Sequence, residues 1–158
     1  MDLKLKGKRA MVTGSSSGLG EAIVKMLAAE GASVVVHGRN EERARKVSED
    51  IINSGGIADI AIGDLSTDKG ADAVAQAALK NGQIDILINN AGATSHKSWG
   101  DASTFDWADM YNNNVVSYVR MIQRLVPQMK TLGWGRLCIL VEAWASSRLK
   151  SSHITMLL

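Results

Sequence analysis

The sequence predicts a doubly wound α/β fold with one parallel sheet of about five strands, and three observations support this class. Apolar runs of strand length alternate with amphipathic stretches of helix length along the 158 residues. Junctions rich in glycine or asparagine separate the two kinds of segment. The chain is 46% hydrophobic with 15 glycines and one proline, so it can bury an independent core. Short connections between alternating strands and helices imply right-handed crossovers and helices on both faces of the sheet.

The apolar runs are the predicted strands, and their composition is typical of strands covered on both faces. They are Arg9–Val12, Ser33–His37, Ala58–Ile62, Ile84–Ile88 and Arg136–Val141. The amphipathic stretches are the predicted helices, Gly18–Ala29, Glu41–Asn53, Thr67–Lys80 and Thr104–Thr131. Asn40 and Ser66 are expected to be N-caps, because their side chains can accept from the first unpaired helical N–H groups. Pro127 is expected to kink or end the last helix.

Composition excludes several classes of protein. The 18 basic and 16 acidic residues give a net charge of +2, which makes no case for nucleic acid. One cysteine, Cys138, excludes a disulfide framework and a cysteine-rich metal site, and no metal is expected. The N-terminus has no apolar signal region, and apolar runs such as Leu137–Val141 are too short to span lipid. The expectation is a cytoplasmic protein without membrane contact.

The strongest local motif is the glycine-rich stretch Thr13–Gly20, which follows the first strand and opens the first helix, as in dinucleotide-binding turns. Gly14 can adopt a positive φ, Gly18 lets the backbone approach a pyrophosphate, and Gly20 lets the helix pack close to the sheet. The helix N-terminus and the serine hydroxyls would then face the phosphates. The alternative is an ordinary glycine-rich turn between a strand and a helix.

Arg39 lies at the end of the second strand, where a ribose-reading residue belongs. An acidic residue there would accept a hydrogen bond from the ribose 2′-hydroxyl and select NAD. Gly38 and Arg39 instead offer a guanidinium that can pair with a 2′-phosphate, which favours NADP(H) over NAD(H). The alternative is a solvated arginine beside the Asn40 cap.

Three further segments, Asp64-Leu65, Asn89–Gly92 and Asp106–Arg120, complete a pattern with the glycine-rich turn and Arg39. Over residues 5–137, in order and spacing, the chain resembles the short-chain dehydrogenase/reductase family. The resemblance implies a Rossmann-like sheet in the order 3-2-1-4-5 and an NAD(P)-dependent oxidoreductase that moves hydride between nicotinamide and a carbonyl or secondary alcohol. It also implies a cofactor site made of Gly14, Ser16, Ser17, Gly18, Leu19, Gly20, Arg39, Asp64, Leu65, Asn90, Ala91 and Gly92.

Within that site, the resemblance places Asp64-Leu65 beside the adenine and Asn90-Ala91-Gly92 under the nicotinamide ribose. The family's catalytic group is an Asn, a Ser and a Tyr-x-x-x-Lys. Among the consecutive asparagines 112–114, Asn114 corresponds to the catalytic Asn, which helps to hold a proton-relay water. The alternative is that three weak helix formers mark a distorted turn.

The rest of the catalytic group has no match. Val141 or Glu142 stands at the serine position, and Tyr111 and Tyr118 are followed four residues later by Val115 and Ile122. The sequence therefore holds no Tyr-x-x-x-Lys, which removes the family's acid/base. Substitutes such as Ser146, Ser147 and Lys150, or a hydrolase built on Ser147 and His153, have no supporting motif, and these residues are interpreted as an exposed tail.

The chain is accordingly divided into a dinucleotide-binding domain at 1–137 and an aberrant tail at 138–158, with the C-terminal part of the family fold missing. Residues 136–158 contain no glycine, and Arg136, Glu142, Arg148 and Lys150 account for the whole net charge. A shifted reading frame from about Cys138 is a hypothesis that the genetic code permits, because the shifted codons can encode Ser, Gly and Tyr in the family's order. Sequencing the gene would test it.

Two classes of function follow. The first is an NADP-dependent oxidoreductase, impaired or inactive in this truncated form, whose intact relatives act on a small carbonyl or alcohol. The second is a non-catalytic dinucleotide-binding or oligomerisation module. A fifth strand at the sheet edge and a long fifth helix predict a homo-oligomer.

Overall fold

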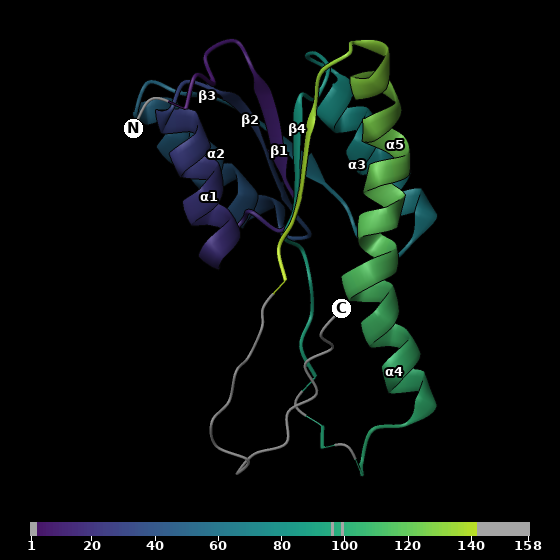
Figure 1. Ribbon diagram of the computed structural model, residues 1–158. Coiled ribbons are helices and arrows are strands. Elements are labelled where there is room, and N and C mark those ends of the chain that lie inside the picture. Colours follow the sequence, from purple (N-terminus) through teal and green to yellow (C-terminus); the bar gives the residue numbers. More distant parts are fainter. Residues whose placement is uncertain (1–2, 96, 99, 142–158) are drawn as a thin grey trace.

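A computed structural model describes residues 3–95, 97–98 and 100–141 as a five-stranded parallel sheet between two layers of helices (Figure 1). The strand order β3-β2-β1-β4-β5 confirms the predicted class and order. The strands are β1 (Arg9–Val12), β2 (Ser33–Gly38), β3 (Ile57–Ile62), β4 (Ile86–Asn89) and β5 (Arg136–Ile139). Register pairs Ala10 of β1 with Val34 of β2 and with Ile86 of β4. The first strand therefore lies at the centre of the sheet.

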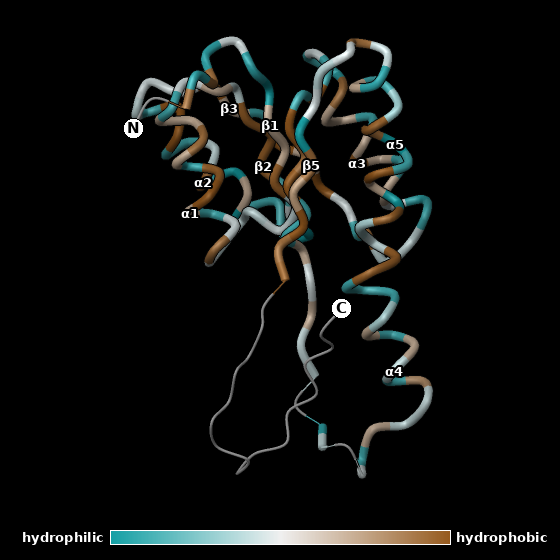
Figure 2. Tube along the Cα trace, in the orientation of Figure 1, coloured by the Kyte–Doolittle hydropathy of each residue, from teal (hydrophilic) through white to brown (hydrophobic). Residues whose placement is uncertain are grey.

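Helices cover both faces of the sheet. They are α1 (Gly18–Ala29), α2 (Glu41–Asn53), α3 (Asp68–Leu79), α4 (Thr104–Tyr111) and α5 (Ser117–Thr131). In Figure 1, α1 and α2 lie on one face, and α3 and α5 on the other. Successive side chains of a strand alternate between faces, so Ala10 and Val12 join the core under α1 and α2 while Met11 joins the core under α3 and α5. Figure 2 shows the apolar strands between the two helical layers.

One of the two predicted N-caps is confirmed and the other is wrong. The Asn40 side chain accepts from the Arg43 backbone N–H at 2.9 Å, as expected. Helix α3 begins at Asp68, and its cap is Thr67, whose hydroxyl accepts from the Gly70 N–H at 3.1 Å. Ser66 is not the cap because it belongs to the preceding turn, in which its own N–H donates to Asp64 Oδ1 at 2.9 Å.

The predicted helix Thr104–Thr131 is interrupted. A π-helical turn, Asn112–Val116, separates α4 from α5. Pro127 was expected to kink or end the helix; it lies inside α5, which continues to Thr131, so it does not end the helix. Pro127 is exposed, and water can therefore solvate the carbonyl group that loses its helical partner there.

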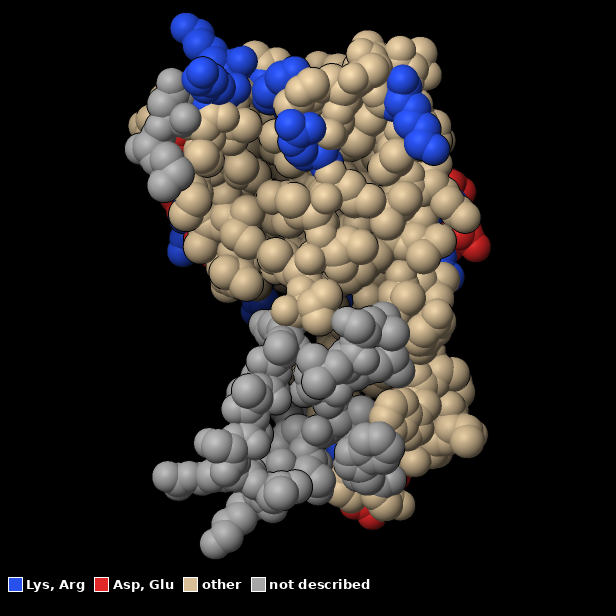
Figure 3. Space-filling model, in the orientation of Figure 1, with Lys and Arg blue, Asp and Glu red and all other residues tan. Residues whose placement is uncertain are grey.

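Strand β5 departs from the expectation that every strand is covered on both faces, since all four of its residues are exposed. It is the edge strand of the described sheet, and Leu137 and Ile139 are 43% and 49% exposed. In the view of Figure 3, β5 is the strand nearest the reader, and few charged side chains lie on this face of the sheet. β5 also runs through the predicted domain boundary at 137/138. The expectations placed on residues 142–158 lie outside the described residues.

In the described part of the chain, no helix has the length and apolar character needed to cross a bilayer.

Candidate functional site

A cleft of about 540 Å³ opens where the carboxyl ends of β1, β2, β3 and β4 meet. Parallel strands direct these ends to one edge of the sheet, which is where α/β proteins bind ligands. The volume lies within the ordinary range for small-molecule sites, roughly 300–1,000 Å³. The predicted site residues that line the cleft are Gly14, Ser16, Ser17, Arg39, Asp64, Leu65, Asn90, Ala91 and Gly92.

Three predicted residues, Gly18, Leu19 and Gly20, are not among the residues that line the cleft. Leu19 is 56% exposed, and Gly18 begins α1 with a φ of +60°. Gly20 is buried where α1 approaches the sheet, and a Cβ there would lie 2.5 Å from Asn90 Nδ2 and against the Gly14 carbonyl oxygen. Its role in the structure is the close packing that the sequence predicts.

The glycine-rich turn lies at the edge of the cleft, which Gly14, Ser16 and Ser17 line. Gly14 has a φ of +66°, and a Cβ on it would lie 2.9 Å from Ala91 Cα, so both conformation and space require glycine. Helices α2, α3 and α4 have side-chain caps, but within the described residues Ser17, the N-cap of α1, forms no side-chain cap hydrogen bond. The N-terminus of α1 therefore presents unpaired donors and the positive end of its dipole.

Two buried or partly buried side chains tie this turn to the end of β4. Thr13 is fully buried, and its hydroxyl oxygen accepts from the N–H groups of Asn90 and Ala91, both at 2.9 Å. Asn90 Nδ2 in turn donates to the carbonyls of Thr13 at 2.9 Å and Gly14 at 3.2 Å. These hydrogen bonds fix the distance between the turn that follows β1 and the segment that follows β4.

His37 is a site residue that the sequence reasoning missed. It lines the cleft, is 3% exposed, and joins the ends of β1, β2 and β3. Its Nδ1 accepts from the Gly14 N–H at 2.9 Å, which leaves Nε2–H to donate to the Gly63 carbonyl at 3.2 Å. Burial lowers the pKa of His37 to about 4, so the ring is neutral at physiological pH. A histidine ending a run of valines was the available signal.

Two basic side chains and a glycine line the cleft where β2 leads into α2. Arg39 and Arg43 both line the cleft and are exposed, and the described residues place no carboxylate within salt-bridge distance of either guanidinium. Gly38 lies beside them, and a Cβ on it would be 2.5 Å from Ser16 Oγ. Arg43 was not predicted from sequence, although it lies in the first turn of α2, which the Asn40 cap places directly after Arg39.

Another wall of the cleft is the segment between β3 and α3, which consists of Asp64, Leu65 and Ser66. The backbone N–H of Ser66 donates to the Asp64 carboxylate and holds its pKa below the ordinary value. Leu65 is 4% exposed, so the wall is anchored in the core.

Asn114, the predicted catalytic residue, is hydrogen-bonded to the backbone of the segment that follows β4, on the side of the cleft opposite residues 64–66. Its Oδ1 accepts from the Ala93 N–H, and its Nδ2 donates to the Ala93 carbonyl, both at 3.0 Å. Nδ2 also donates to the Met110 carbonyl at 2.9 Å. A Cβ on Gly92 would lie 2.6 Å from Asn114 Oδ1. The asparagine that lines the cleft is its neighbour Asn113, together with Ser117.

The family model of the short chain dehydrogenases matches residues 8–146. The chain belongs to the short chain dehydrogenase family. Among curated relatives, an uncharacterized oxidoreductase of Bacillus subtilis, YvrD, is 36% identical over 137 residues, which are 87% of this chain and 52% of the relative. The 3-oxoacyl-(acyl-carrier-protein) reductase FabG of Aquifex aeolicus is 34% identical over 87% of this chain and 56% of its own length. The chain thus spans about half the length of these curated relatives.

Solved structures of the family give the same result. The 7α-hydroxysteroid dehydrogenase complexed with NADH and 7-oxo glycochenodeoxycholic acid has a TM-score of 0.86 and 34% identity, covering 93% of this chain and 58% of that one. L-sorbose reductase from Gluconobacter frateurii, complexed with NADPH and L-sorbose, has a TM-score of 0.88 and 32% identity, covering 96% of this chain and 59% of that one. The first of these two structures holds NADH and the second holds NADPH.

Proposed function

We propose that the cleft binds NADP(H), and that this chain is the cofactor-binding part of an oxidoreductase acting on a carbonyl or secondary alcohol. The observation that carries the proposal is the pair of cleft-lining arginines, Arg39 directly after β2 and Arg43 in the first turn of α2. A bound nicotinamide cofactor would supply or accept the hydride.

The glycine-rich turn fits the pyrophosphate of a dinucleotide. The uncapped N-terminus of α1 offers N–H donors and positive dipole to an anion, and the Ser16 and Ser17 side chains lie at the same opening. Gly14 and Gly38 keep this opening free of side-chain atoms. Gly18, Leu19 and Gly20 support the turn from the helix side.

The two arginines fit a 2′-phosphate. Each guanidinium can donate two parallel hydrogen bonds to phosphate oxygens, and the described residues offer neither of them a salt bridge in its place. Because relatives bind NADH as well as NADPH, the preference for NADP(H) rests on this pair and on the lack of an acidic residue at Gly38 or Arg39.

The remaining walls fit the two ends of the cofactor. Asp64 and Leu65 would lie beside the adenine, while Asn90, Ala91 and Gly92 would pass under the nicotinamide ribose. Asn114 would act at that end by holding the backbone of Ala93 in place. The resemblance predicts the roles given to residues 64–65 and 90–92, whereas the role given to Asn114 follows from its hydrogen bonds to Ala93.

Binding without catalysis is the second candidate function. The printed sequence holds no Tyr-x-x-x-Lys, so the family's acid/base is not within these residues, and we propose that this chain alone turns over slowly or not at all. The exposed strand β5 favours a role in association with a second copy of the chain, through the edge that pairs with no other strand of the described residues. A sedimentation experiment in which the chain remains a monomer would contradict that association. Cytoplasmic localisation also stays a prediction.

Calorimetric titration with NADPH and with NADH tests cofactor binding. We expect NADPH to bind more tightly, and Arg39→Gln and Arg43→Gln each to weaken NADPH by roughly 10-fold or more, since a hydrogen bond to a charged group contributes about 1.5–3 kcal/mol. NADH affinity should not change.

Arg45→Gln is the matched control, because Arg45 lies on the same helix, pairs with Glu41 and does not line the cleft. Equal affinity of the unaltered chain for both cofactors would overturn the preference for NADP(H), and no binding of either would overturn the proposed function. Carbonyl-dependent consumption of NADPH then separates the two candidates, since binding without consumption supports the second.

A further inference from the structure

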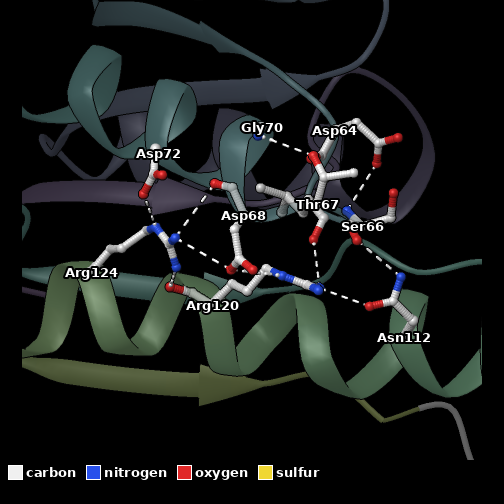
Figure 4. Close-up of polar contacts among 10 residues, drawn as sticks. Asp64, Ser66, Thr67, Asp68, Gly70, Asp72, Asn112, Arg120 and Arg124 are labelled. Atoms are coloured by element: carbon white, nitrogen blue, oxygen red, sulfur yellow. Dashed lines mark hydrogen bonds and ion pairs between the residues drawn. The ribbon is translucent and has the colours of Figure 1, made fainter.

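The wall formed by residues 64–66 is held from outside by α5 and the π-helical turn. Asn112 Nδ2 donates to the Ser66 carbonyl at 3.0 Å, and Arg120 Nη1 donates to the Leu65 carbonyl at 3.2 Å. Figure 4 shows both side chains reaching from the long helix to this segment. The two carbonyls that set the path of the wall are thus fixed by side chains 46 and 55 residues further along the chain.

Asn112 and Arg120 form one unit. Arg120 Nη1 also donates to Asn112 Oδ1 at 2.8 Å, so the Asn112 amide is oriented with its N–H group toward Ser66. Arg120 is only 13% exposed, and its Nε pairs with Asp68 Oδ1 at 3.2 Å. Each group in this unit therefore has a partner, and a displacement of the wall would break several hydrogen bonds together.

The same π-helical turn also holds the wall at residues 90–93, because the Asn114 side chain forms hydrogen bonds with the backbone N–H and carbonyl of Ala93. Residues two apart on a helix do not face each other, so Asn112 and Asn114 can reach to different sides of the cleft. The turn therefore joins the wall at 64–66 to the wall at 90–93.

On the basis of the function proposed above, we propose that Asn112, oriented by Arg120, is a positioning residue for the adenine half of the cofactor. Asn112 is not among the residues that line the cleft. It sets the position of the Asp64–Ser66 wall, so its loss should weaken ligands that carry the adenine and 2′-phosphate whether or not a nicotinamide is attached.

The test compares Asn112→Ala with Arg124→Gln, titrated with NADPH and with adenosine 2′,5′-bisphosphate. Arg124 is the matched control. It joins α5 to α3 by pairing with Asp68 and Asp72, but it donates to no cleft-lining residue. Asn112→Ala should weaken both ligands by the same factor, about 5- to 10-fold for one lost hydrogen bond. Arg124→Gln should leave both dissociation constants within about twofold of the unaltered chain.

Hydrogen exchange without ligand gives an independent readout. Asn112→Ala should speed exchange of the Ser66 and Thr67 amides, and Arg124→Gln should not. Asn112→Ser, whose side chain is too short to reach Ser66, is a second variant with the same expected result. If the unaltered chain binds neither ligand, the proposed function fails and this inference with it. If it binds both, and Asn112→Ala binds them as tightly with unchanged exchange, this inference alone fails.

Discussion

Removing the titratable ring of His37 should abolish a specific part of the protein's acid sensitivity. The neutral ring accepts a hydrogen bond from the Gly14 N–H and donates one to the Gly63 carbonyl. In a protonated ring Nδ1 also carries a hydrogen, so two donors would face each other and the hydrogen bond with Gly14 would be lost. Burial is the largest cause of the lowered pKa, and the Arg39 charge lowers it further, while the hydrogen bond to Gly63 and the Asp64 charge oppose the shift.

The magnitude follows from the two pKa values. A fall from 6.5 in the unfolded chain to about 4 in the folded protein corresponds to about 3 kcal/mol of unfolding free energy. Because the folded pKa is the lower one, the unfolded chain binds the proton first as the pH falls. The stabilisation is therefore complete above pH 6.5, declines below it, and is gone once the pH has passed below about 4.

The assay is urea unfolding of the unaltered chain and of His37→Gln, above pH 6.5 and at about pH 4. Glutamine keeps a carbonyl oxygen and an N–H group but does not titrate. All other ionisable side chains, including His96 and His153, are the same in the two proteins, so the difference between the two losses isolates His37. Between the two pH values, the unaltered chain should lose about 3 kcal/mol more than the variant. Equal losses in both proteins would refute the assignment of a buried neutral His37.

Two further substitutions test how the turn is held, each by urea unfolding. Thr13→Val keeps the shape of the side chain but leaves the Asn90 and Ala91 N–H groups unpaired, which should cost about 2–4 kcal/mol, whereas Thr131→Val, at an exposed helix end, should cost under about 0.5 kcal/mol. Gly20→Ala should cost about 1–3 kcal/mol through overpacking against Asn90, although helix propensity favours alanine. Gly100→Ala is its control, since an added Cβ would meet only Ser98 Oγ at 4.0 Å. A loss at Gly20 no larger than at Gly100 would contradict the close packing of α1.

Features set by neighbouring residues were predictable from the sequence. The bounds of α1 and α2 agree with the predicted ranges, because a glycine-rich turn opens one and the Asn40 cap opens the other. The Ser66 cap was wrong because serine and threonine stand side by side there, and the choice depends on which N–H the Asp64 carboxylate takes.

Features set by distant residues were not predictable in this way. His37 meets Gly14 and Gly63, which are 23 and 26 residues away. A histidine after three valines indicates a polar residue at the end of a buried strand, but it does not identify either partner. The three asparagines were interpreted either as a distorted turn or as the position of a catalytic Asn. The structure has the distorted turn at Asn112–Val116, and the contacts of Asn112 and Asn114 show that a distorted turn can also hold a cleft together.

The central position of β1 has a consequence for synthesis of the chain. β1 can pair with β2 once residue 38 has been made, but its other edge waits for Ile86–Ile88 of β4. At typical rates of translation this leaves the most buried strand with one open edge for roughly 2–10 s. During that interval the β1 edge is free to pair with another nascent chain, so the order of strands in the finished sheet makes the growing chain most prone to aggregate before β4 has been made.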